Sequence, residues 1–163
     1  MNLNEMRKRF GPTFLPELLG VTPRAASMMQ CGMTALTVDS LYRLHQIPAF
    51  DLAAEVKRLG LKRAETRKCR ARLLKPWTPL RVLPRFLRQL PDGTKDLHWL
   101  CRVCGRKAVA QALGATTRTL RDMTDGTSAL SIDDLYRLTL AYPLFDVIGT
   151  VTFLGSKRKD KAE

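Results

Sequence analysis

The chain has no uninterrupted apolar stretch long enough to form a membrane helix. Charged residues or prolines break every apolar run well before the roughly 18 residues that a membrane span needs. The first residues, Met1-Asn2-Leu3-Asn4-Glu5, also lack the apolar core of a secretory signal. We therefore expect no membrane partner and a cytoplasmic location, with association to the nucleoid if nucleic acid is bound.

Cysteine is scarce, and the motifs of common enzyme classes are missing. Four cysteines in 163 residues do not suggest a disulfide scaffold. Cys101-x-x-Cys104, with His98 close by, supplies one ligand pair where a structural zinc site usually needs two, so small core cysteines are the favoured interpretation. The chain has no phosphate-binding glycine loop, no His-Glu-x-x-His motif and no convincing nucleophile. We expect no enzyme activity, no cofactor and no metal.

Acidic residues are few relative to basic ones. The chain has 28 Lys and Arg residues against 15 Asp and Glu residues, a net charge of +13. Most of the excess falls in residues 53–96, which hold 13 basic and 4 acidic residues. A positive field of this size attracts polyanions such as nucleic acid.

What the chain does contain is an internal repeat. Displaced by 94 positions, residues 19–44 match residues 113–138 at 13 of 26 positions, including Leu-Tyr-Arg-Leu at the end of each segment. With one inserted residue, Phe50-Asp51 then matches Phe145-Asp146, and Leu59-Gly60 matches Leu154-Gly155. The repeat covers about 3–63 and 97–158, and duplication is its natural explanation.

Each copy has the pattern of several short helices. In the second copy, apolar periodicity predicts helices over 96–103, 106–113 and 117–124 and a fourth that follows Ser131. Gly114 ends the second of these helices, and Thr116 and Ser131 are placed to cap the two that follow. The first copy repeats the plan with Thr22 and Thr37 as caps, and Pro16 is expected to shorten or kink its second helix over 12–19.

This arrangement resembles the lambda-repressor/Cro (Xre-type) helix-turn-helix family. The resemblance rests on Leu-Gly-x-Thr, a capped helix that ends near glycine, and Leu-[Thr/Ser]-x-Asp-x-Leu-x-x-Leu, and it covers roughly 40–50 residues of each copy. It implies an all-α fold of two tandem bundles, residues 1–63 and 97–158. A basic, proline-containing connector, 64–96, would join them, and a basic tail, 159–163, would follow. Family members usually carry one such unit per chain.

The resemblance also implies which side chains would contact DNA, because the third helix of the family lies in the major groove. In the second copy these residues are Thr116, Thr117, Arg118 and Arg121. In the first copy they are Thr22, Arg24, Ser27 and Met28. Arg24 and Arg118 occupy the same position, and solvated helix surface is the alternative role for each arginine. The first copy's reading helix is unusually apolar, so it could read DNA weakly or bind a protein partner.

Other repeated side chains have two interpretations. Arg43 and Arg137 could contact phosphates or could pair with Asp39 and Asp133 one turn earlier. The tyrosines of Leu-Tyr-Arg-Leu, Tyr42 and Tyr136, are expected in the core.

The middle of the chain and its end give further expectations. Residues 53–75 are predicted to form a basic helix that Gly60 interrupts. Its phosphate contacts would come from Lys62, Arg63, Arg67 and Arg70, and a solvated linker helix is the alternative. Four prolines interleaved with apolar residues predict a packed connector that either fixes the two copies or forms a dimer contact. The β-branched run 147–153 predicts a short strand, and the basic run Lys157-Arg158-Lys159-Asp160-Lys161 predicts a disordered tail.

The sequence as a whole favours a sequence-specific transcription regulator with two DNA-reading units per chain. Its expected partner is double-stranded DNA with an imperfect palindrome or paired half-sites, bound by one chain or by a homodimer. Small basic regulators of this kind are common on mobile genetic elements. The alternatives are a nonspecific nucleic-acid-binding or architectural protein, and a module that binds another regulator through its first unit.

Overall fold

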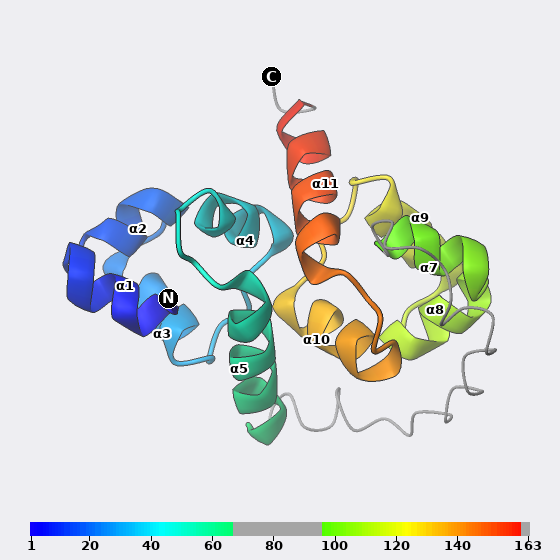
Figure 1. Cartoon of the computed structure of the whole chain (residues 1–163), viewed down its shortest axis with the longest axis horizontal. Coiled ribbons are helices and arrows are strands. Elements are labelled where there is room, and N and C mark those ends of the chain that lie inside the picture. The colour runs from blue at the N-terminus through cyan, green and yellow to red at the C-terminus, as the bar shows by residue number, and fades with distance from the viewer. Residues whose placement is uncertain (67–95, 161–163) are drawn as a thin grey trace.

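The computed structural model describes residues 1–66 and 96–160, and every regular element in these two segments is an α-helix (Figure 1). The all-α prediction is therefore confirmed for the described residues, which contain one isolated β-bridge and no strand. The proposed connector falls almost entirely on residues 67–95, outside the described residues, as do residues 161–163 of the proposed tail.

The first copy forms five helices: α1 (Leu3–Phe10), α2 (Phe14–Leu19), α3 (Pro23–Gln30), α4 (Val38–His45) and α5 (Leu52–Glu65). Thr22 and Thr37 cap α3 and α4 as expected, because their side chains accept hydrogen bonds from Ala25 N and Ser40 N. Helix α2 begins at Phe14, so Pro16 lies in its first turn, where the missing N–H group would have had no helical partner.

The second copy forms α7 (Leu97–Val103), α8 (Arg106–Leu113), α9 (Thr117–Thr124), α10 (Ile132–Ala141) and α11 (Val147–Asp160). The predicted helices 106–113 and 117–124 agree with α8 and α9 residue for residue. Asp96, Thr116 and Ser131 accept hydrogen bonds from the backbone at the starts of α7, α9 and α10. Both copies therefore have the same order of helices and the same caps.

Three local predictions were wrong. Residues 147–153 lie in α11 and not in a strand, because Val147, Val151 and Leu154 form a buried helical face that outweighs the β-propensity of the run. Gly60 does not interrupt α5, which instead ends at Glu65 with Thr66 as its C-cap. The basic residues Lys157 and Arg158, expected near the start of a disordered tail, belong to α11.

The last helix of each copy packs on the fourth helix of the other copy. Helix α5 lies mainly against α10, and α11 lies mainly against α4 (Figure 1). The contacts are reciprocal, so the two copies are related by an approximate two-fold axis between them. The final helix of each copy consequently completes the core of the other copy.

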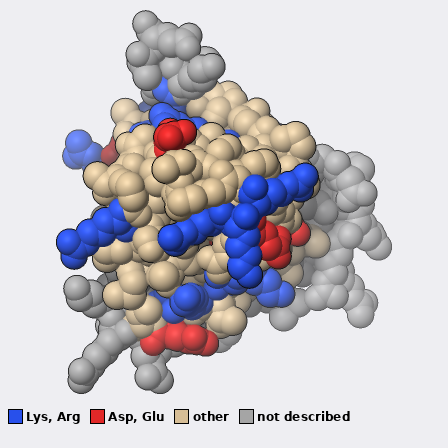
Figure 2. Space-filling model, turned by 90° about the vertical axis from the view of Figure 1, so that its left-hand side faces the viewer, with Lys and Arg blue, Asp and Glu red and all other residues tan. Residues whose placement is uncertain are grey.

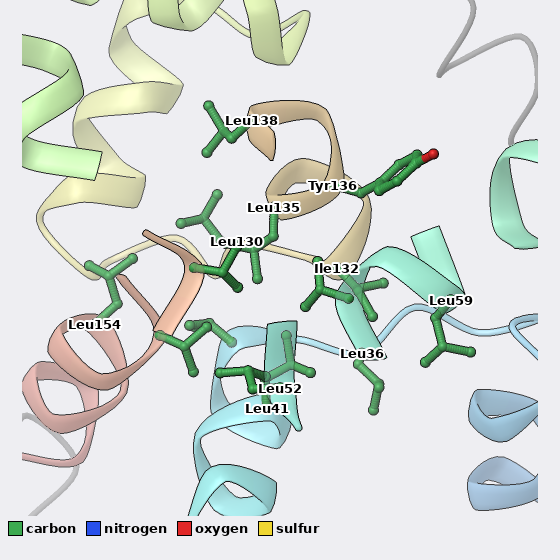
Figure 3. Packing of buried hydrophobic residues seen from close by; sticks show 14 of the residues in the cluster. Leu36, Leu41, Leu52, Leu59, Leu130, Ile132, Leu135, Tyr136, Leu138 and Leu154 are labelled. Carbon is green, nitrogen blue, oxygen red and sulfur yellow. The ribbon is translucent and has the colours of Figure 1, made fainter. Parts of the chain in front are cut away.

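The centre of this arrangement is one continuous apolar core. Leu36, Leu41 and Leu52 of the first copy lie close to Leu130, Ile132 and Leu135 of the second (Figure 3). Leu36 and Leu130 stand in the segments before α4 and α10, which meet as a short antiparallel bridge. The bridge consists of Val38 N donating to Leu130 O and Ile132 N donating to Leu36 O, both at 2.8 Å. These two bonds satisfy backbone groups that the shared core would otherwise leave buried and unpaired.

The exchanged helices approach their partners very closely at two equivalent glycines. A Cβ atom added to Gly60 of α5 would lie 2.3 Å from the Tyr136 ring, and one added to Gly155 of α11 would lie 2.3 Å from the Tyr42 ring. Tyr136 is buried and Tyr42 is half-buried, so the prediction that both are packing residues is confirmed. Glycine at these two positions is what allows each tyrosine ring to lie against the backbone of the exchanged helix.

Candidate nucleic-acid interface

In each copy a tight turn joins two short helices and fixes the second of them. The turn is made by Gly20 after α2 and by Gly114 after α8, with φ of 65° and 63°, a left-handed conformation that favours glycine. Thr22 and Thr116 then cap the next helix through bonds of 3.2 and 3.1 Å to Ala25 N and Thr119 N. The two turns therefore present α3 and α9 in the same way.

A repeated arginine supports each turn from α4 or α10. The Nη1 atom of Arg137 donates to Leu113 O at 2.6 Å, and the Nη1 atom of Arg43 donates to Leu18 O at 3.4 Å. The acceptors are carbonyls near the C-terminal ends of α8 and α2, where the helix dipole favours a cation. Asp39 and Asp133 pair with Arg158 and Arg63 of the other copy, so the alternative in which they pair with Arg43 and Arg137 one turn later was wrong.

Helix α9 exposes a polar surface. Thr116, Thr117, Arg118 and Arg121 are all exposed, whereas Leu120 and Met123 on the opposite side are buried. The Arg121 side chain is 69% exposed, and its Nε atom lies 3.8 Å from Asp125 Oδ2. A pair this exposed contributes little to stability, so Arg121 is available for another partner.

Helix α3 exposes a less polar surface. Thr22 and Arg24 are exposed, Ser27 is half-buried, and Met28 is 38% exposed. The buried side of α3 carries Ala26 and Gln30, and Gln30 Oε1 accepts a bond from Arg7 of α1. The structure thus brings the predicted site residues of each copy onto one capped helix, with the charge concentrated in the second copy.

The four residues that were predicted to contact phosphates differ in where the structure places them. Lys62 is exposed on α5, whereas Arg67 and Arg70 lie outside the described residues. Arg63 is buried, with Nε and Nη2 bonded to the Asp133 carboxylate of α10 at 2.6 and 2.7 Å and Nη1 bonded to Gly32 O at 2.9 Å. Arg63 therefore joins the two copies and does not lie on the surface as a phosphate ligand.

The equivalent ion pair occurs on the other side of the two-fold axis. Arg158 Nε donates to Asp39 Oδ1 at 2.7 Å, and its Nη1 donates to Gly126 O at 2.9 Å. Local patterns do not predict these two ion pairs, because each aspartate also has an arginine one turn later on its own helix. Their signal in the sequence is the presence of the same aspartate and the same arginine in both copies.

Exposed basic side chains extend the candidate interface beyond α3 and α9. Figure 2 shows Lys and Arg side chains across the middle of the face formed by the first copy, with fewer acidic groups. Sequence reasoning also missed two separate sets of exposed cations, Arg7, Lys8 and Arg9 on α1 and Arg106 and Lys107 on the first turn of α8. Arg106 and Lys107 stand at a helix N-terminus, where the dipole disfavours positive charge, and this placement was a usable signal for an anionic partner.

The described residues contain no group of three or more His, Cys, Asp or Glu side chains that could hold a metal ion. Cys101 and Cys104 are half-buried and pack against the core. Burial raises the pKa of the Cys104 thiol and raises the pKa of Cys101 to about 11. Both are environments in which a thiol stays protonated and unreactive.

Cys101 should consequently react slowly with iodoacetamide at pH 8, because only about 0.1% of a thiol with a pKa near 11 is ionised there. A raised pKa places the rise in reactivity near pH 11, well above that of an ordinary cysteine. Mass spectrometry of the folded protein, labelled over a pH series, measures this, with urea-unfolded protein as the control. Equal rates for folded and unfolded protein at pH 8 would show that the Cys101 environment is described wrongly.

Among the described residues, no helix is long and apolar enough to cross a membrane. No protein-family model matches the chain, and no significant match was found among curated proteins or solved structures.

Proposed function

We propose that this chain is a sequence-specific, double-stranded-DNA-binding regulator that carries two helix-turn-helix units. Helices α3 and α9 would be its recognition helices. The pairs α2–α3 and α8–α9 have the required short turn, N-terminal cap and exposed first turn. The net charge of +13 and the exposed cations beside these helices support a polyanionic partner.

One observation carries the proposal. Three arginines of the repeat are present in both copies: Arg24 and Arg118, Arg43 and Arg137, and Arg63 and Arg158. The second pair supports the turns and the third joins the copies, so the fold accounts for both. Arg24 and Arg118 are exposed and make no hydrogen bond or ion pair with another described residue. A partner outside the chain would account for their presence in both copies, and arginine in a recognition helix suits guanine.

The shared core favours binding by one chain. Because α5 and α11 are exchanged and the two arginine–aspartate pairs join the copies, both units are held in one fixed relation. A single chain would thus act as a covalent equivalent of a dimeric repressor and contact two half-sites together. Nonspecific binding of nucleic acid, and binding of another regulator through the apolar α3, are the alternatives that the experiment below separates.

Arg118→Ala is expected to lower the preference for the cognate sequence by about tenfold or more, since a bidentate arginine–guanine contact contributes about 1–3 kcal/mol of discrimination. A duplex enriched from a random pool supplies the cognate sequence. Mobility-shift titrations then measure its affinity and that of a scrambled duplex at 50 and 200 mM salt.

Lys57→Ala is the matched control, since it removes one exposed positive charge from α5 and leaves both recognition helices unchanged. It should weaken both duplexes slightly and equally. Equal losses on both duplexes from Arg118→Ala would point to nonspecific binding. Failure of the pool to yield any enriched duplex would leave the protein-binding alternative.

A further inference from the structure

The two recognition helices have the same framework and different exposed side chains. Their buried positions match in kind, with Ala26 and Met29 in α3 at the places of Leu120 and Met123 in α9. Caps, turns and supporting arginines also match. Any difference in what the two helices read must therefore come from their exposed side chains.

Those side chains differ in number of hydrogen-bond donors. In α9, Arg118 and Arg121 are one turn apart, which places them on the same side of the helix. In α3 only the first of these arginines is present, as Arg24, and Ser27 takes the place of Arg121. Helix α9 thus has two arginines that can each bind a guanine through two hydrogen bonds, and α3 has one. We therefore expect α9 to require more guanines than α3.

The remaining exposed position of α3 is apolar. Met28 occupies the place of Asp122 and is 38% exposed. Ala25 replaces Thr119, so α3 offers a methyl group and a thioether beside Arg24. Apolar side chains of this kind contact the C5-methyl group of thymine in the major groove.

We propose that the DNA target is a bipartite site with two unequal halves. The half beneath α9 would require two guanines, read by Arg118 and Arg121. The half beneath α3 would require one guanine, read by Arg24, with a neighbouring thymine beside Met28. This inference rests on the proposed function and adds the class of sequence that is bound, which is directional and not palindromic.

Directionality follows from the fixed relation of the two copies. In a symmetric homodimer both half-sites meet identical helices, so the best site is a palindrome. Here the two helices belong to one chain and cannot be exchanged for identical ones. The protein consequently has one preferred orientation on its site.

The test is selection of duplexes from a random pool with the full chain and with one grafted variant. The graft Pro23→Thr/Ala25→Thr/Ser27→Arg/Met28→Asp gives α3 the exposed side chains of α9 and leaves its buried side unchanged. The original chain should enrich a site with unequal halves, and the graft should enrich a site whose halves are inverted copies of the α9 half. Thermal unfolding of both proteins checks that the graft folds.

A second variant keeps the test decisive if the graft is unstable. Arg121→Ser makes α9 resemble α3 at one exposed position and should relax the preference at one base pair of the stronger half by about tenfold. A palindrome enriched by the original chain would overturn this inference and leave the proposed function intact. Absence of any enriched sequence would overturn the proposed function and this inference with it.

Discussion

Asp133→Ala should lower the free energy of unfolding by about 3 kcal/mol, because it leaves the Arg63 guanidinium buried without its carboxylate. The side chains of Arg63 and Asp133 are 7% and 14% exposed, so water cannot replace the lost partner. The Gly32 carbonyl, which accepts a bond from Arg63 Nη1 at 2.9 Å, is neutral and cannot replace the negative charge of the lost carboxylate. Urea unfolding followed by circular dichroism measures the change.

Asp39→Ala is the matched control, since it removes the equivalent carboxylate on the other side of the two-fold axis. Arg158 and Asp39 are 25% and 40% exposed, so solvent can take over part of the interaction. We expect a loss of about 1 kcal/mol for this variant. Equal losses from the two variants would show that burial does not determine the strength of these ion pairs.

Gly60→Ala should also destabilise the protein, by about 2 kcal/mol. Alanine normally stabilises a helix interior relative to glycine by about 1 kcal/mol. Here its Cβ atom would lie 2.3 Å from Cγ of Tyr136 and 2.5 Å from its Cβ, so α5 and α10 must move apart. The resulting loss of packing along this contact outweighs the gain in helix propensity.

Thermal unfolding of Gly60→Ala, Gly155→Ala and Lys57→Ala provides the measurement. Gly155→Ala should behave like Gly60→Ala, because it meets Tyr42 with the same geometry. Lys57→Ala lies on the exposed side of α5 and should leave the melting temperature nearly unchanged. A more stable Gly60→Ala protein would refute the close approach of the exchanged helix.

Local structure was predictable because local signals determine it. Threonine and serine at positions 22, 37, 116 and 131 cap helices, and glycine at 20 and 114 ends them, through bonds to backbone groups a few residues away. Because the two copies share one pattern, the helix boundaries indicated by one copy could be compared with those of the other. Helices α8 and α9 were consequently predicted to the residue.

The exchange of α5 and α11 could not be predicted in the same way. Apolar periodicity shows which side of a helix is buried, but two similar copies offer two similar places for that side to pack. The error at residues 147–153 has a related cause, since Val147 and Val151 favour a strand locally and only the apolar surface of α4 makes a helix preferable. Tertiary packing decided both outcomes.

For the candidate interface, the sequence predicted which arginine side chains are exposed, but it did not predict which of them form ion pairs. The capped helices already indicated that Arg24 and Arg118 would be exposed, and both are. Arg63 lies in a basic segment and was expected on the surface. Its buried pairing with Asp133 depends on a contact across 70 positions of sequence, which no local pattern reports.

The bridge between Thr37 and Ser131 has a consequence for how the protein folds. These segments are about 94 residues apart in the chain, so the central core depends on contacts of high sequence separation, which slow folding. During synthesis the first copy leaves the ribosome before α10 and α11 exist, so its α5 lacks the helix against which it mainly packs. The apolar surface of the first half therefore stays exposed until the second half has been synthesised. Both halves should then fold together in one cooperative step.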